Sequence, residues 1–191
     1  VISEQITLPL GYSAVWGGQF ELQQKANKRF AIVIPITLAL IMLLLYLSFN
    51  SLKSVSLILL NIPLALVGGI IGLWITGQNL SVPSSVGFIA LFGIALGNGM
   101  VLVSYLNQLA TQDDDVQSVS LRGALRRAKP VLMTTATTAL GLIPLLLSSG
   151  TGSEVQRPLA TVVMGGLVTS TIVTLLVMPA IYRWFINKRD N

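Results

Sequence analysis

The sequence predicts an all-α membrane protein with five transmembrane helices. Of its 191 residues, 53% are hydrophobic and only 10% are charged, whereas soluble domains carry about 25% charged residues. The apolar residues gather in five segments, each close to the roughly 20 residues that a helix needs to cross a bilayer. All seven acidic residues lie outside these segments, as expected for helices in lipid.

Residues 1–29 predict a short stub outside the membrane. Residues 6–21 favour a short strand, a turn and a glycine-rich link, and residues 21–29 predict a helix that continues into the first apolar segment. The start lacks the basic residues and the apolar run of a signal peptide. It therefore indicates an internal part of a longer chain, in which residues 30–191 form one membrane domain.

The five spans follow one another with short connections, which predicts antiparallel neighbours. They are expected at about 30–49, 55–76, 82–107, 130–149 and 158–186. Between the third and fourth spans, residues 113–127 begin with three aspartates and end with two arginines, an order that suits a helix dipole. We expect a surface helix there, lying along the cytoplasmic face of the membrane and ending at Pro130.

Lysine and arginine predict the orientation, because cytoplasmic loops are enriched in them. The expected spans place eight on one side and four on the other. The richer side should be cytoplasmic, so that the N-terminal stub faces outward and the C-terminus faces the cytoplasm. The eight are Lys53, Arg122, Arg126, Arg127, Lys129, Arg183, Lys188 and Arg189, and the four are Lys25, Lys28, Arg29 and Arg157.

Several classes of function are disfavoured by what the sequence lacks. It has no cysteine and no histidine, so disulfides, thiolate metal sites and the commonest transition-metal ligand are absent. It shows no phosphate-binding loop and no hydrolase or metalloprotease motif. The basic residues lie at segment ends, where topology explains them better than nucleic acid does. We therefore predict no enzyme activity, no cofactor and no metal site, and interpret the five methionines as core or lipid contacts.

Small residues recur four apart in three of the spans, a pattern that lets helix backbones approach closely. We interpret these stripes as packing faces, with a sliding surface for conformational change as the alternative. The predicted packing residues are Gly68, Gly72, Gly93, Gly97, Gly166, Ser170 and Thr174.

Polar residues within the spans are the candidates for function. Asn98 lies near the middle of the third span, and Thr134, Thr137 and Thr138 share one face of the fourth. Asn98 fits either an interhelical hydrogen bond or a proton relay. The threonines fit either hydroxyls that bond their own backbone or the lining of an ion path. Arg127, seven residues before Thr134, fits either an interfacial anchor or a basic residue of that path.

Six segments together, in order and over nearly the whole chain, resemble the resistance-nodulation-division efflux pumps. They are most similar to the heavy-metal cation exporters of that superfamily. The segments are WGGQFE at 16–21, NIPLALVGG at 61–69, residues 85–105, RRAKPVLMTT at 126–135, residues 141–160 and residues 164–182.

This resemblance implies a parent protein that is a proton-driven antiporter of the inner membrane. The parent would be a homotrimer, joined to a periplasmic adaptor and an outer-membrane channel, with two six-helix repeats in its membrane domain. The present chain would supply five helices, most of the second repeat, preceded by the tail of the periplasmic region. It would be inactive alone, because the essential acidic residues of the family lie in the other half.

The resemblance also implies roles for three residues. Asn98 and Thr134 match positions of the family's proton pathway, and Arg127 matches a basic residue at its cytoplasmic mouth. Gly97 stands where the multidrug branch has a lysine, which favours the metal branch. Two alternatives stay open: a multidrug or lipid exporter of the same superfamily, and a structural fragment that complements a separate N-terminal half. No ligand set identifies the metal.

Overall fold

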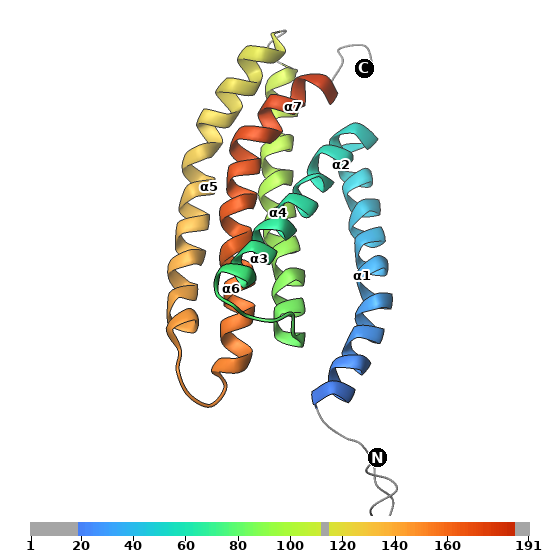
Figure 1. The fold of residues 1–191 in the computed structure, drawn as a ribbon. Helices are drawn as coiled ribbons and strands as arrows, with labels where there is room; N and C mark the ends of the chain where they lie inside the picture. Colours follow the sequence, from blue (N-terminus) through green and yellow to red (C-terminus); the bar gives the residue numbers. More distant parts are fainter. Residues whose placement is uncertain (1–18, 112–114, 186–191) are drawn as a thin grey trace, which may run out of the picture.

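The computed structural model describes residues 19–111 and 115–185, which form helices joined by short connections (Figure 1). Within these two ranges there is no β-strand, which confirms the predicted all-α class. The strand expected near the start lies outside the described residues. The helices are α1 (Gln19–Phe49), α2 (Leu52–Leu59), α3 (Asn61–Ile75), α4 (Val82–Ala110), α5 (Val116–Leu147), α6 (Ser153–Ile172), a π-helical turn η1 (Val173–Val177) and α7 (Met178–Phe185).

Five helical stretches are long and apolar enough to cross a membrane, as the sequence predicts. They are Gln23–Phe49, Leu52–Ile75, Val82–Ala110, Val116–Leu147 and Ser153–Tyr182. The second stretch combines α2 with α3, and the fifth combines α6, η1 and α7. Two of the five expected spans are therefore helices with an internal irregularity.

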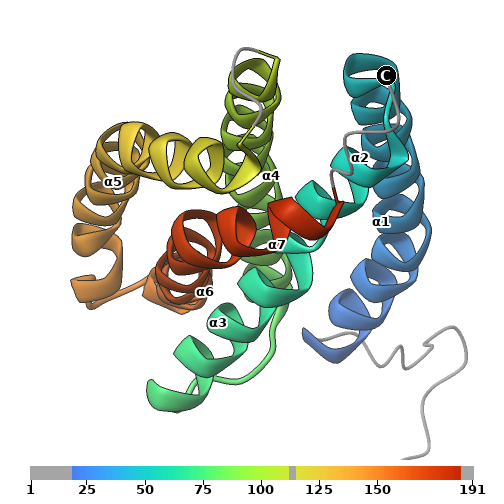
Figure 2. The same cartoon turned by 90° about the horizontal axis from the view of Figure 1, so that it is seen from above.

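The break between α2 and α3 lies at Leu60, and Pro63 supplies its physical cause. Proline has no backbone N–H, so Pro63 cannot donate a hydrogen bond to the carbonyl of Leu59, four residues earlier. The N–H of Leu60 bonds to the carbonyl of Ser56 at 3.0 Å, which completes the end of α2. Figures 1 and 2 show that α2 and α3 cross the other helices at a slant.

Helix α5 differs from the expectation at Pro130. We predicted a surface helix that ends at this proline and a separate span after it, but one helix runs from Val116 to Leu147. A single proline removes one hydrogen bond and tilts the axis without ending a helix whose other bonds hold. Figure 2 shows the change of direction between the two halves of α5. Asp115 caps its start by accepting hydrogen bonds from the backbone N–H groups of Gln117 and Ser118.

The centre of the bundle is α6, which packs against α3, α4 and α5. A cluster between α3, α4 and α6 includes the buried Ala65, Leu91 and Val162. Helix α1 packs along α2 and α4 but leaves most of its apolar surface exposed, as expected of a helix that borders lipid or a further protein segment.

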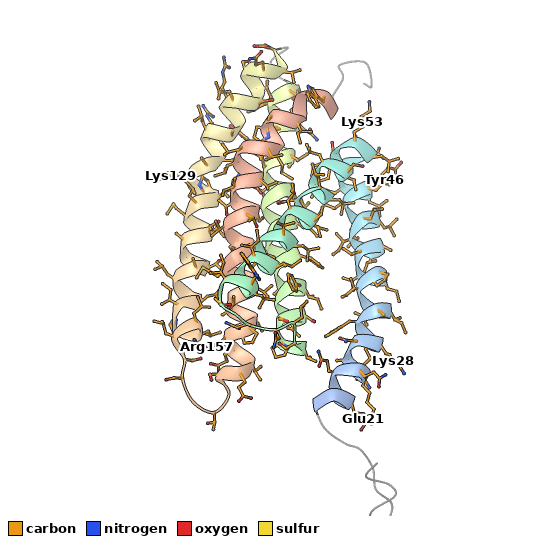
Figure 3. All side chains as sticks on the ribbon, in the orientation of Figure 1. Glu21, Lys28, Tyr46, Lys53, Lys129 and Arg157 are labelled. Carbon is orange, nitrogen blue, oxygen red and sulfur yellow. The ribbon has the colours of Figure 1, made fainter. Side chains whose placement is uncertain are left out.

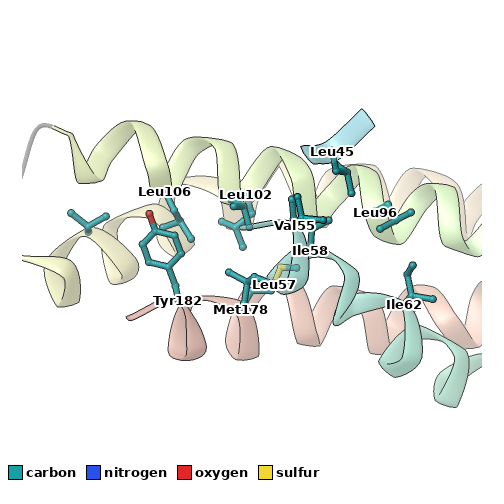
Figure 4. Close-up of a cluster of buried hydrophobic side chains, with 12 residues drawn as sticks. Leu45, Val55, Leu57, Ile58, Ile62, Leu96, Leu102, Leu106, Met178 and Tyr182 are labelled. Atoms are coloured by element: carbon teal, nitrogen blue, oxygen red, sulfur yellow. The ribbon is translucent and has the colours of Figure 1, made fainter. Parts of the chain in front are cut away.

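A second buried cluster lies between α2, α4 and α7, and Leu45 of α1, Ile62 of α3 and Val119 of α5 join it (Figure 4). Its largest fully buried side chains include Leu57, Leu102, Met178 and Tyr182. The core therefore surrounds α4, with α3 and α6 against its first half and α2 and α7 against its second half.

Candidate polar pathway and its supporting contacts

Asn98 is a half-buried residue of α4 whose amide nitrogen has unused hydrogen-bonding capacity. Its Nδ2 atom is buried and makes no hydrogen bond to any described residue. Buried donors are nearly always paired, and leaving one unpaired costs about 1–3 kcal/mol. Asn98 therefore has a donor that is free to bond to a further group, and both interpretations of this residue stay predictions.

The threonines of α5 bond mainly to their own helix. Thr134 Oγ1 donates to the carbonyl of Pro130 at 3.0 Å, and Thr137 and Thr138 make equivalent bonds four residues back. The side chain of Thr134 is exposed in this chain. Each hydroxyl keeps lone pairs that can accept a further bond, so this face remains able to bind water or another helix.

Arg127 stacks on an aromatic ring of the neighbouring helix. Its Cζ atom lies 4.6 Å from the ring centroid of Tyr105 on α4, a cation–π contact. Nη1 of Arg126 also donates to the Tyr105 hydroxyl at 3.4 Å. These two contacts tie the first half of α5 to α4, close to the expected cytoplasmic end.

The three predicted pathway residues lie on two adjacent helices. Asn98 belongs to α4, whereas Thr134 and Arg127 belong to α5, and α4 packs against α5. No hydrogen bond joins the three among the residues that the structure describes. Their joint role in proton transfer stays a prediction.

The predicted packing residues divide into two groups. A methyl group at Gly68 of α3 would collide with the side chain of Thr169 and the carbonyl of Gly165 on α6, and one at Gly166 would collide with Leu91 of α4. At Gly72 the carbonyl of Thr161 would lie at 3.0 Å. By contrast, nothing lies within 4 Å of the methyl positions at Gly93 and Gly97.

Asn61 is a functional candidate that the sequence interpretation missed. Its side chain is fully buried at the start of α3. Nδ2 donates to the carbonyl of Ala95 on α4 at 2.8 Å and to Oγ1 of Thr174 in η1 at 3.0 Å. Ser170 of α6 donates to its Oδ1 at 3.5 Å. Two of the predicted packing residues, Ser170 and Thr174, are therefore its partners, and an amide inside the apolar second span was the available signal.

A second polar group links the helices nearer the end of α7. The hydroxyl of the buried Tyr182 donates to Oδ1 of Asn107 on α4 at 2.9 Å. Nδ2 of Asn107 donates in turn to Oγ of Ser54 on α2 at 3.4 Å. This group lies beyond Asn98 along α4, toward the C-terminal end of that helix.

Four basic residues of the described chain mark the two ends of the bundle. Figure 3 shows Lys53 and Lys129 toward one end and Lys28 and Arg157 toward the other. Within residues 19–111 and 115–185, no three acidic side chains gather into a possible metal site.

Together, the five apolar helices and the buried polar groups at their centre define a membrane-embedded helical bundle of the transporter type. The chain belongs to the AcrB/AcrD/AcrF family, whose family model matches residues 1–186.

Similar proteins include several metal-resistance proteins. The cobalt-zinc-cadmium resistance protein CzcA of Cupriavidus metallidurans is 47% identical over 190 residues, which are 100% of this chain and 18% of that protein. The cation efflux system protein CusA of Escherichia coli K12 is 37% identical over 95% of this chain and 18% of its own length. The chain thus spans less than a fifth of these relatives.

A solved structure agrees with the sequence relatives. The crystal structure of a heavy metal efflux pump superposes with a TM-score of 0.81 at 46% identity, covering 96% of this chain and 19% of that chain. The expected resemblance to heavy-metal exporters of the resistance-nodulation-division superfamily is therefore confirmed, and with it the prediction of a multi-pass membrane protein.

Proposed function

We propose that this chain is the C-terminal transmembrane part of a proton-driven exporter of heavy-metal cations in the inner membrane. The observation that carries the proposal is the match along nearly the whole chain, in sequence and in structure, to a heavy metal efflux pump. The parent would act as a homotrimer with a periplasmic adaptor and an outer-membrane channel. The chain would form most of the second six-helix repeat, with its C-terminus in the cytoplasm.

Within that parent, Asn98 and Thr134 would line the proton pathway, and Arg127 would stand at its cytoplasmic mouth. The unpaired Nδ2 of Asn98 and the exposed hydroxyl of Thr134 support this assignment, because the first is a free donor inside the bundle and the second can bond to water or to a partner from outside the chain. The metal would bind elsewhere in the parent, since the described part of the chain gathers no acidic ligand set.

The test is growth of an efflux-deficient bacterium on graded zinc, cobalt, cadmium, copper and silver, and on dyes. We expect metal resistance from the full-length parent gene and none from this chain alone. Resistance to dyes without resistance to metals would contradict the substrate class. Resistance from the chain alone would contradict its dependence on acidic residues in the other half.

A further inference from the structure

We infer that Asn61 is a positioning residue of the proposed proton pathway. It fixes α4, which carries Asn98, against the last span, and through that span it fixes α5, which carries Thr134. This inference rests on the proposed function and adds to it a residue outside the pathway.

The first step is that Asn61 uses both hydrogens of its amide between two other helices. Nδ2 bonds to the Ala95 carbonyl at 2.8 Å and to Thr174 Oγ1 at 3.0 Å, and the residue is fully buried. Ala95 lies three residues before Asn98, and residues three apart share one side of a helix. A shift of α4 relative to Asn61 would therefore move Asn98 as well.

The second step continues from the last span to α5. Thr171, next to Ser170, donates its hydroxyl hydrogen to the carbonyl of Leu167 at 2.7 Å. The hydroxyl of Thr135 must then be the donor in its 2.9 Å contact with Thr171. Thr135 directly follows Thr134. The last span, which bonds to Asn61 through Thr174, therefore also bonds to the part of α5 that contains Thr134.

The third step concerns the π-helical turn that contains Thr174. Such turns are rare, and they occur frequently at functional sites. The turn lies directly before Met178 and α7, and the bond from Asn61 to Thr174 reaches inside it. Asn61 thus contacts the irregular segment of the last span and the helix that bears Asn98, through a single side chain.

The test uses the full-length parent in proteoliposomes, with transport driven by a pH gradient and with Zn²⁺, Co²⁺ and Cu⁺ as probes. The variants are Asn61→Leu, Thr174→Val and the double variant, with Thr174→Ser as the conservative replacement. We expect turnover to fall by about five- to tenfold in each single variant, about the effect of losing one buried hydrogen bond. The metal KM should stay within about twofold, Thr174→Ser should restore turnover, and the double variant should be no worse than either single one.

The matched control is Asn107→Leu. It removes an amide from the Ser54–Tyr182 group, which joins α4 to α2 and α7 and makes no hydrogen bond to α5 among the described residues. We expect it to leave turnover near the wild-type value. An equal loss in Asn107→Leu, or normal turnover in both Asn61→Leu and Thr174→Val, would overturn the inference.

A second readout does not depend on transport. Spin labels at Val86 on α4 and Leu147 on α5, both exposed, report the distance between the two helices in the purified parent. Asn61→Leu and Thr174→Val should shift or broaden that distance, and Asn107→Leu should not. Unchanged distances in the first two would overturn the inference, whereas absence of pH-driven metal transport in the wild type would overturn only the proposed function.

Discussion

Glycines in this bundle differ in what surrounds them, although they look alike in the sequence. Gly68 faces Thr169 and the backbone of Gly165 so closely that no side-chain carbon fits, whereas Gly93 faces open space within the described chain. In membranes, close backbone approach is a main source of helix association. An added methyl group should therefore destabilise the bundle at Gly68 and leave it unchanged at Gly93.

Gly68→Ala should destabilise the parent by about 1–3 kcal/mol, the usual cost of overpacking a tight interface. Gly93→Ala should change stability by less than about 0.5 kcal/mol, as expected at a position without neighbours. Thermal unfolding of the purified parent measures both. A large loss in Gly93→Ala would mean that another segment of the parent packs on that face, as the predicted packing role of Gly93 and Gly97 requires.

Thr134→Ala in the parent should lower efflux about fivefold, the equivalent of one hydrogen bond of about 1 kcal/mol. The change removes a hydroxyl that bonds only its own helix here, so assembly of the trimer should not change. Metal efflux from loaded cells and the size of the purified complex check the two parts. Thr137→Ala makes the same chemical change one turn away and serves as control; normal efflux in Thr134→Ala would remove Thr134 from the pathway.

The sequence drew attention to Asn98 and missed Asn61, and the reason for the difference is physical. Asn98 stood out because an amide in a long apolar run is costly, and the structure finds it without a partner among the described residues. Asn61 is also an amide in a long apolar run, but the nearby Pro63 drew attention to a kink in this span and not to the amide. Its partners, Ala95 and Thr174, are far away in the chain, and sequence periodicity does not report which helices meet.

At the scale of elements, helix boundaries were predicted well where polar residues flank an apolar run. Helix α4 begins at Val82 as expected, because Ser81 and Ser84 bond each other's backbone in a capping box. Helix α5 was divided wrongly at Pro130, because a proline ends some helices and only bends others. The decision depends on whether the residues on both sides are held by other helices, as the Arg127–Tyr105 contact and the Thr135–Thr171 bond hold them here.

Pro130→Ala should straighten α5, because it restores the donor for the carbonyl of Arg126. A straight helix from residue 121 to residue 140, which stops before the second proline of α5 at Pro144, would span about 29 Å. Spin labels at the exposed Leu121 and Leu140 should move toward that separation in the variant. The control is Pro83→Ala, in the first turn of α4 where no donor is needed; it should leave the distance between the labels unchanged. An unchanged distance in Pro130→Ala would mean that packing alone causes the bend.

At the scale of the whole molecule, the bundle has two ends that differ in charge. Lys53 and Lys129 lie toward one end, and Lys28 and Arg157 lie toward the other (Figure 3). The excess of basic residues at the first end predicts that it faces the cytoplasm. The orientation in the membrane therefore follows from the distribution of basic residues over the whole chain, and no single helix determines it.

Single cysteines introduced at Thr151 and Leu121 should reveal this topology, since the chain has none of its own and both sites are exposed. In a parent otherwise free of cysteine, a membrane-impermeant maleimide should label the Thr151→Cys variant in intact spheroplasts. The Leu121→Cys variant should react only after the membrane is opened. The reverse pattern would invert the proposed orientation.

The π-helical turn Val173–Val177 has a consequence for the numbering of related chains. A π turn accommodates one residue more than the α-helical turns that would join the same two ends. Met178 and Tyr182, which follow the turn, are both fully buried. The extra residue therefore sets the rotation of α7 that points these two side chains into the core. A relative whose last span is a regular α-helix should therefore lack one residue in this turn, and an alignment gap inside a transmembrane helix would record where the extra residue entered.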